Sequence, residues 1–211
     1  MSELLERCPV LHEVLERRTA ISVRHAEALF ETVARMQPSV VLEIGMASGG
    51  STLAILAALS EGDGRLVSID PRQSSYWENS GRDLVTRSGF GAHHELIEDF
   101  DYNALPRLLS AGRHVDLAYI DGWHTFDHAF LDWWYVDKML SVGGIVGFND
   151  CGWPAVDKVI RFVLGHRKYT EIDVGLPKRS VGPIFRRRQS QDRYFSKDEE
   201  WEPRWDFYAP F

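Results

Sequence analysis

Short apolar runs alternate along this chain with longer segments of helical character, and this alternation limits the fold more than any other feature. The first runs are residues 40–44, 65–70, 93–97, 115–121 and 143–150. The segments between them are long enough for crossover helices, and in one of them Phe126, Phe130 and Trp133 recur at helical spacing. Strands that alternate with helices form a parallel sheet with helices on both faces. The sequence therefore predicts an α/β protein with a doubly wound sheet.

Both ends of the chain add to this core. Two further apolar runs, 169–174 and 182–187, predict a terminal hairpin, which makes the sheet seven-stranded and mixed, with one antiparallel strand. Near the N-terminus, Leu4, Cys8 and Leu11 lie at helical spacing, and Ser22 is a candidate N-cap for a second helix. The expected organisation is an N-terminal helical cap (1–38), a ligand-binding core (39–188) and an aromatic-rich C-terminal tail (189–211).

Composition narrows the class of ligand. The net charge of -7 argues against nucleic acid or an anionic membrane as partner, and the basic run 186–188 is too short to reverse this. No stretch is apolar and long enough to cross a bilayer, and the N-terminus lacks a signal-peptide pattern. Two cysteines do not make a disulfide framework. We therefore expect a cytoplasmic protein with a small-molecule ligand.

The stretch VVLEIGMASGGST, residues 40–52, reads as a strand, a glycine loop and the start of a helix. In an open parallel sheet, ligands bind beyond the carboxyl ends of the strands. Gly45, Gly49 and Gly50 allow the backbone to approach a ligand closely, and a helix N-terminus suits a carboxylate or a phosphate. An ordinary strand–turn–helix connection would use glycines too, so the loop alone does not decide the ligand.

Asp70 strengthens the case for a nucleoside ligand. It ends the second predicted strand, where an acid accepts hydrogen bonds from ribose hydroxyls. The dinucleotide fingerprint G-x-G-x-x-G lacks its second glycine here, and Glu43 would repel a pyrophosphate. An acid near the loop instead suits the ammonium group of S-adenosylmethionine (SAM).

The stretch LEIGMASGGST resembles the first motif, E/D-x-G-x-x-x-G, of the class I SAM-dependent methyltransferases, which have a Rossmann-like fold. The closer resemblance is to small-molecule O-methyltransferases, including catechol O-methyltransferase and the metal-dependent sugar O-methyltransferases of antibiotic pathways. The strand ends IDGWH and GFND carry this narrower likeness, which extends over about residues 20–175.

The resemblance implies a set of cofactor contacts. Glu43, Gly45 and Ser51 would hold the methionine part of SAM, and Asp70 would hold the ribose. At the end of the third strand, Asp99 would lie near the adenine amino group and Phe100 against the adenine ring.

Four polar residues follow the fourth and fifth predicted strands and are expected to converge. Asp121, Asn149 and Asp150 offer oxygen ligands that suit a hard cation such as Mg²⁺. His124 has a pKa near neutrality and sits where the relatives have a catalytic lysine or histidine, so we expect it to act as the base. With a bound metal, Asp121 would also help to lower the pKa of the acceptor hydroxyl.

Two positions depart from the families that the chain resembles. Cys151, a poor magnesium ligand, stands where the catechol enzymes have an asparagine ligand. Asn149 stands where the sugar enzymes have an acid. The predicted magnesium site therefore carries less negative charge than in those families.

The predicted function is transfer of a methyl group from SAM to a hydroxyl group of a small molecule, in natural-product or sugar O-methylation, by a homo-oligomer that is expected to be a dimer. Three alternatives remain open from the sequence. The chain could bind the cofactor without catalysis, use it for chemistry other than methyl transfer, or be a nicotinamide-dependent oxidoreductase.

Overall fold

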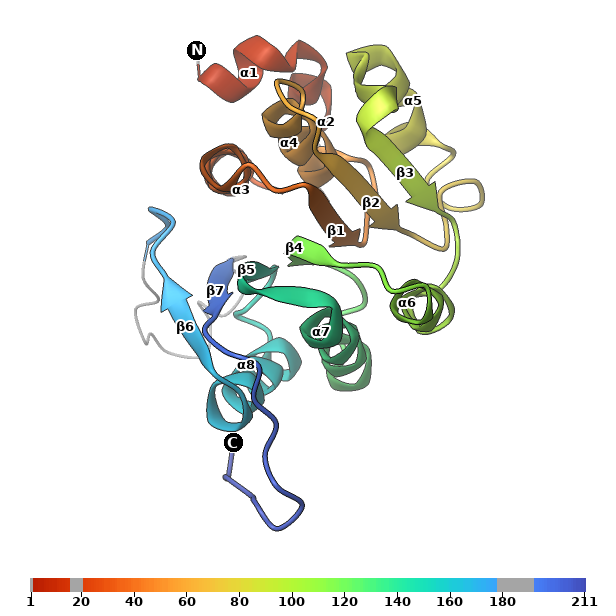
Figure 1. Ribbon diagram of the computed structural model, residues 1–211. Helices are drawn as coiled ribbons and strands as arrows, with labels where there is room; N and C mark the ends of the chain where they lie inside the picture. Colours follow the sequence, from red (N-terminus) through yellow and green to blue (C-terminus); the bar gives the residue numbers. More distant parts are fainter. Residues whose placement is uncertain (1, 16–20, 178–191) are drawn as a thin grey trace.

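The computed structural model describes residues 2–15, 21–177 and 192–211, and these residues form one sheet between two layers of helices (Figure 1). The sheet has seven strands in the order β3-β2-β1-β4-β5-β7-β6. The strands are β1 (Val40–Ile44), β2 (Arg65–Ile69), β3 (His94–Ile97), β4 (Val115–Ile120), β5 (Leu140–Phe148), β6 (Tyr169–Ile172) and β7 (Arg193–Lys197).

The strand pairing confirms the predicted fold class. Strands β1 to β5 pair in parallel, and β7 pairs antiparallel with both β5 and β6. Strand β1 has the bounds that the apolar run 40–44 predicts. Because the chain winds outward from β1 to β2 and β3, and then returns to β4 on the other side of β1, the carboxyl end of β1 lies at a topological switch point.

The helices divide between the two faces of the sheet, and each layer has its own apolar core. One layer contains α1 (Glu3–Arg7), η1 (Pro9–Leu11), α2 (His12–Leu15), α3 (Val23–Met36), α4 (Gly50–Leu59), α5 (Ser80–Ser88) and η2 (Phe90–His93). The other contains α6 (Asp101–Ser110), α7 (Phe126–Met139) and α8 (Pro154–His166). Among the described residues, no helix is long and apolar enough to cross a membrane.

The N-terminal residues pack as the sequence predicts. Ser22 accepts a hydrogen bond from the backbone N–H of His25 and so caps α3. Leu4, Cys8 and Leu11 are buried in the apolar core that α3 and α4 share. Two short helices and a 3-10 turn, rather than one continuous helix, bring these side chains to the core.

The seventh strand comes from a different part of the chain than the sequence suggests. Residues 193–197 form it, within the segment 189–211 that the sequence assigns to an irregular tail, whereas the run 182–187 lies outside the described residues. Tyr194 and Phe195 are fully buried on opposite faces of the sheet, in different cores. Aromatic residues on both faces of a short strand give no alternation of apolar and polar positions, so the strand is hard to recognise.

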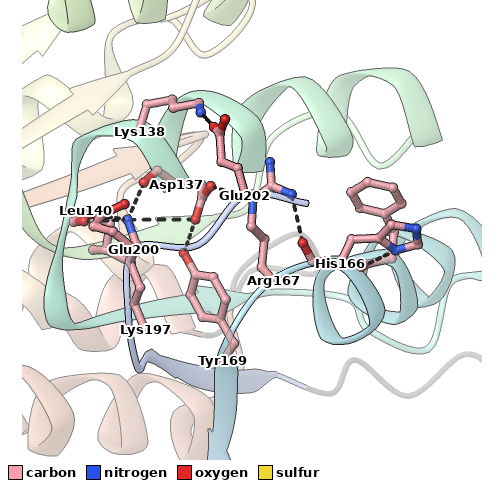
Figure 2. A network of polar contacts seen from close by, with 10 residues as sticks. Asp137, Lys138, Leu140, His166, Arg167, Tyr169, Lys197, Glu200 and Glu202 are labelled. Atoms are coloured by element: carbon pink, nitrogen blue, oxygen red, sulfur yellow. Dashed lines mark hydrogen bonds and ion pairs between the residues drawn. The ribbon is translucent and has the colours of Figure 1, made fainter. Parts of the chain in front are cut away.

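A buried lysine fixes the end of β7 (Figure 2). Lys197 Nζ donates hydrogen bonds to the carbonyl oxygens of Asp137 (2.7 Å) and Leu140 (3.0 Å), and to Glu200 Oε1 (2.7 Å). The side chain of Asp137 in turn accepts from Tyr169 Oη (2.7 Å) and Arg167 Nε (3.1 Å). This cluster joins the end of α7, the start of β5, and the strands β6 and β7.

We predict that Lys197→Ala lowers the free energy of unfolding by about 2 kcal/mol, because it leaves buried carbonyl groups without a donor. Urea denaturation of the purified protein measures this loss. The matched control is Lys138→Ala, which removes the ion pair with the more exposed Glu202 and should cost less than about 1 kcal/mol. Equal losses in the two variants would show that Lys197 does not anchor β7.

Candidate active site

A cavity of about 580 Å³ opens at the carboxyl ends of β1, β2, β3 and β4. Its wall comes from the glycine loop after β1, from residues 69–72 and 76–77 after β2, from residues 100–102 after β3 and from residues 121–123 after β4. The cavity thus lies at the switch point of the sheet, and its size suits a nucleoside-sized ligand. The side chains of Trp77 and Trp123 line it.

Gly45 lets the loop after β1 pack against the end of β4. Its φ angle is +93°, in the region that favours glycine, and its N–H donates to the carbonyl oxygen of Ile69 (2.9 Å). A Cβ atom at this position would lie 2.1 Å from the carbonyl oxygen of Asp121. Any larger residue would therefore push apart the two strand ends that form the floor of the cavity.

Asp70 lines the cavity and also ties the loops together. Its Oδ2 accepts from the backbone N–H of Ala47 (2.7 Å), and its Oδ1 accepts from that of Arg72 (2.8 Å). Each carboxylate oxygen keeps a further lone pair for a ligand hydroxyl. Asp70 thus lies in the cavity wall at the end of β2, and its contact with a ribose stays a prediction.

Glu43 lies beneath the loop rather than in the cavity wall. Its fully buried carboxyl accepts hydrogen bonds from Ser51 Oγ (2.5 Å), Thr52 Oγ1 (2.8 Å) and Ser68 Oγ (2.6 Å). Burial raises the pKa of Glu43 to about 7, although the three hydroxyl groups favour the charged form. Glu43 and Ser51 therefore bind each other and support the loop, and a direct contact of either with the cofactor stays a prediction.

The end of β3 differs in detail from what the resemblance implies. Asp99 does not line the cavity, because its side chain binds Asn103 and Arg107 (2.6 Å) on the outer side of α6. These hydrogen bonds hold the pKa of Asp99 below its usual value. After β3, the acid that lines the cavity is Asp101 instead. The placement of Asp99 beside the adenine amino group thus gains no support from the structure.

Aromatic rings surround this end of the cavity. Phe100 and Tyr102 line it and stack on each other, with ring centroids 5.0 Å apart. His128 also lines it, and its Nδ1 lies 2.8 Å from Asp101 Oδ2. These faces and edges offer the stacking and polar contacts that a purine needs, in agreement with the predicted place of Phe100.

The second predicted group, Asp121, His124 and Asp150, converges beside the cavity. His124 Nε2 lies 3.3 Å from Asp121 Oδ1 and 3.6 Å from Asp150 Oδ2. Asp121 lines the cavity. His124 contacts Asp121, and Asp150 contacts His124. Asp150 has a φ angle of +52°, a strained backbone conformation that aspartate tolerates better than most residues and that is frequent at functional sites.

The charges of this group act on each other. Burial lowers the pKa of His124, but the hydrogen bond and charge of Asp121, together with the charge of Asp150, outweigh this effect and raise the pKa overall. Burial raises the pKa of Asp121, against the influence of His124. A proton on His124 is therefore stabilised by two neighbouring carboxyl groups.

Asn149 belongs to a buried network behind these residues. Its Nδ2 donates to Tyr119 Oη (3.2 Å) and to Asp192 Oδ1 (3.0 Å), and Asp192 also contacts His25 Nδ1 (3.3 Å). This network joins α3 and the segment before β7 to the end of β5. It turns the amide NH₂ group of Asn149 inward.

These distances test whether Mg²⁺ fits the predicted ligands. His124 Nε2 is close to both Asp121 and Asp150, so the imidazole takes the place beside the two carboxylates. Within residues 2–15, 21–177 and 192–211, no three or more acidic, histidine or cysteine side chains are arranged as a metal site. In the described residues the imidazole of His124 lies next to both carboxylates, and no metal-binding group is formed there.

Sequence reasoning missed three acidic, basic or histidine side chains of the cavity wall, Arg72, Asp101 and His128. Arg72 lies with its guanidinium carbon 5.9 Å from the ring centroid of Trp123, across the opening between the β2 and β4 loops. In the sequence, Asp101 and His128 stand outside the motifs that mark the other site residues. The available signal was the spacing from Asp101 to the strand end at residue 97, which places it on the same sheet edge as Asp70 and Asp121.

The family of the chain follows from its sequence. Residues 42–151, more than half of the chain, match the methyltransferase domain family. The chain therefore belongs to this family, and the predicted class, a class I SAM-dependent methyltransferase, is confirmed. No curated protein sequence matches the chain significantly.

Solved structures share the fold. The O-methyltransferase TomG from Streptomyces achromogenes, involved in tomaymycin synthesis and solved with SAM, has a TM-score of 0.70 and 19% identity, over 94% of this chain and 91% of that one. An O-methyltransferase from Bacillus cereus in complex with S-adenosylhomocysteine (SAH) has a TM-score of 0.67 and 16% identity, over 92% and 90%. The SAH-bound methyltransferase PaMTH1 from Podospora anserina has a TM-score of 0.68 and 18% identity, over 94% and 89%.

We predict that Asp70→Ala weakens the binding of SAM by about 1–3 kcal/mol, because the charged acceptor for the ribose hydroxyls is lost. Calorimetric titration with SAM measures the effect. Asp99→Ala is the matched control, since this acid lies outside the cavity, and it should bind SAM like the unmodified protein. If Asp99→Ala weakens binding more than Asp70→Ala, the assignment of the two acids is wrong.

Proposed function

We propose that this chain transfers the methyl group of SAM to a hydroxyl group of a small-molecule acceptor. One observation carries the proposal. The cavity built by the glycine loop and Asp70 also contains Asp121, which contacts His124. The wall of the nucleoside-sized cavity therefore includes the carboxylate partner of a candidate base, and methyl transfer to a hydroxyl needs a base beside the cofactor.

The residues of the cavity fit SAM. Gly45 brings the backbone close, Asp70 faces the ribose position, and Phe100 and Tyr102 present ring faces. Asp121 adds negative charge at the end of β4, which favours the positively charged sulfonium. When bound, SAM supplies a methyl group that is already activated for transfer.

The chain's own residues then have three tasks. The walls of the cavity align the acceptor oxygen and exclude water. His124 accepts the proton of the acceptor hydroxyl, and the carboxylates of Asp121 and Asp150 stabilise the imidazolium that forms. Because these carboxylates raise the pKa of His124, proton uptake by its ring is more favourable than it would be in water.

Magnesium stays a prediction from the sequence. Since His124 occupies the place beside Asp121 and Asp150, no step of this mechanism passes through a metal ion. Once His124 has accepted the proton, its imidazolium supplies positive charge next to the two carboxylates.

The nature of the acceptor is proposed at the level of its class. Trp77, Trp123 and Tyr76 line the cavity and favour a flat or sugar-like acceptor, in agreement with natural-product or sugar O-methylation. TomG, an O-methyltransferase involved in tomaymycin synthesis that shares the fold, supports the same class. A homodimer and a cytoplasmic location likewise remain predictions.

The test of this function is production of SAH from SAM with a panel of phenols and sugars. We predict that His124→Ala lowers kcat by roughly 10²–10⁴-fold and leaves SAM affinity nearly unchanged. Turnover of the unmodified enzyme should rise with pH as His124 loses its proton, at a pKa above the ordinary value for histidine. This rise should be absent in the variant.

The matched control is His93→Ala, because His93 binds the carbonyl oxygen of Gly64 and does not line the cavity. This variant should keep full activity. If His124→Ala turns over an ordinary alcohol as fast as His93→Ala does, His124 is not the base.

We predict that EDTA leaves the rate unchanged, because the ring of His124 rather than a metal ion lies next to Asp121 and Asp150. The measurement is turnover after dialysis against EDTA, with and without added Mg²⁺. A loss of activity that Mg²⁺ restores, and that Asp150→Ala abolishes, would instead establish the magnesium site predicted from the sequence.

A further inference from the structure

Asp132 is a buried acid that the proposed mechanism leaves without a task. It lies on α7 with no exposed surface, next to the fully buried Trp133. Neither of its carboxyl oxygens accepts a hydrogen bond from an N–H or O–H group of the described residues. Buried carboxyl groups nearly always have such partners, so this one calls for a physical explanation.

Asp132 connects to the cofactor cavity through another acid. Burial, together with the charge and hydrogen bond of the Asp101 carboxyl, raises the pKa of Asp132 well above its ordinary value. A neutral Asp132 can donate its O–H to Asp101, which also accepts from the backbone N–H of Tyr102 and contacts His128. In this arrangement one carboxyl oxygen of Asp132 carries the proton that points to Asp101, and the other oxygen remains as an acceptor.

The other side of Asp132 faces the turn that carries His124. A cavity of about 10 Å³ lies there, and Gly122, His124, Asp132 and Asn149 line it among apolar neighbours. This volume is about the minimum that holds one water molecule, and a buried water needs polar partners. Asp132, fully buried and without a donor of its own, supplies one of them.

The turn, defined as residues 121–125, offers the other partners. The backbone N–H groups of Gly122, Trp123 and His124 make no hydrogen bond within the part of the chain that the structure describes. Asp132 Oδ2 lies directly under the turn, 3.3 Å from where a Cβ atom of residue 122 would be, and the glycine there leaves this space open. The carboxyl and the turn are thus close neighbours that make no direct hydrogen bond.

We propose that Asp132 is a positioning residue, which holds the turn 121–125 through one buried water in this small cavity and thereby sets the place of His124 beside Asp121 and Asp150. For its effect on catalysis this inference rests on the proposed function. A base displaced by about 1 Å can lose as much as 10²-fold in rate, so support from behind the turn matters for turnover.

The kinetic test compares three variants of the full chain. Asp132→Leu removes the polar group, and we expect it to lower kcat between about 10- and 100-fold with little change in the KM for SAM. Asp132→Asn keeps a donor and an acceptor for the water and should retain most of the activity. Asp137→Asn, a buried acid of the same helix with partners at the far end of α7, is the matched control and should retain kcat.

Three kinetic results would overturn the proposal. The first is an unchanged kcat and an unchanged KM for SAM in Asp132→Leu. The second is an equal loss of kcat in Asp132→Asn and Asp132→Leu. The third is a rise in the KM for SAM of Asp132→Leu with kcat unchanged. The last result would mean that Asp132 acts only on Asp101 and the cofactor cavity.

A structural test does not depend on activity and so separates this inference from the proposed function. High-resolution crystal structures of the unmodified protein should show one water between Asp132 and the turn. In Asp132→Leu this water should be missing and the ring of His124 displaced from Asp121. A dry cavity in the unmodified protein would overturn the proposal even if Asp132→Leu did not fold. An unmoved His124 in a folded Asp132→Leu would overturn it too.

Discussion

The site depends most on the hydrogen bonds that the buried carboxyl of Glu43 accepts. This carboxyl accepts from hydroxyl groups on α4 and on β2, while Glu43 itself belongs to β1. Three elements that are separate in the sequence are therefore fixed to each other under the glycine loop. Because an unpaired acid in this position would cost several kcal/mol, the hydroxyl groups and the acid are required together. The loop above them can then approach a ligand without losing its shape.

The site that stands on this support is rich in acids. Asp70 and Asp101 face one part of the cavity, and Asp121 faces another with Asp150 behind it. Such a wall would repel a pyrophosphate, and it complements a ligand that carries a positive charge. His124 is the cationic partner that the chain itself supplies at the catalytic end. The same electrostatics thus favours SAM over a dinucleotide and couples the base to its carboxylates.

The parts of the fold that follow from local chemistry could be predicted from the sequence. The strand 40–44 follows from periodicity, and the cap of α3 follows from the preference of Ser22 for that position. Asp121, His124 and Asp150 converge because parallel strands end at one edge of the sheet. The strand at 193–197 could not, because both of its faces are buried and its register depends on Lys197 reaching the end of α7. Nor could sequence spacing tell which of Asp99 and Asp101 faces the cavity. Their side-chain partners decide it, because Asp99 binds Arg107 and Asp101 contacts His128.

The most direct test of the account is a crystal structure of the protein with SAH. The account predicts electron density in the cavity at the carboxyl ends of β1 to β4, with the ribose hydroxyls on Asp70, the adenine beside Phe100 and Tyr102, and the sulfur on the side of Asp121. Binding elsewhere, or a ribose that leaves Asp70 bound only to Ala47 and Arg72, would contradict it.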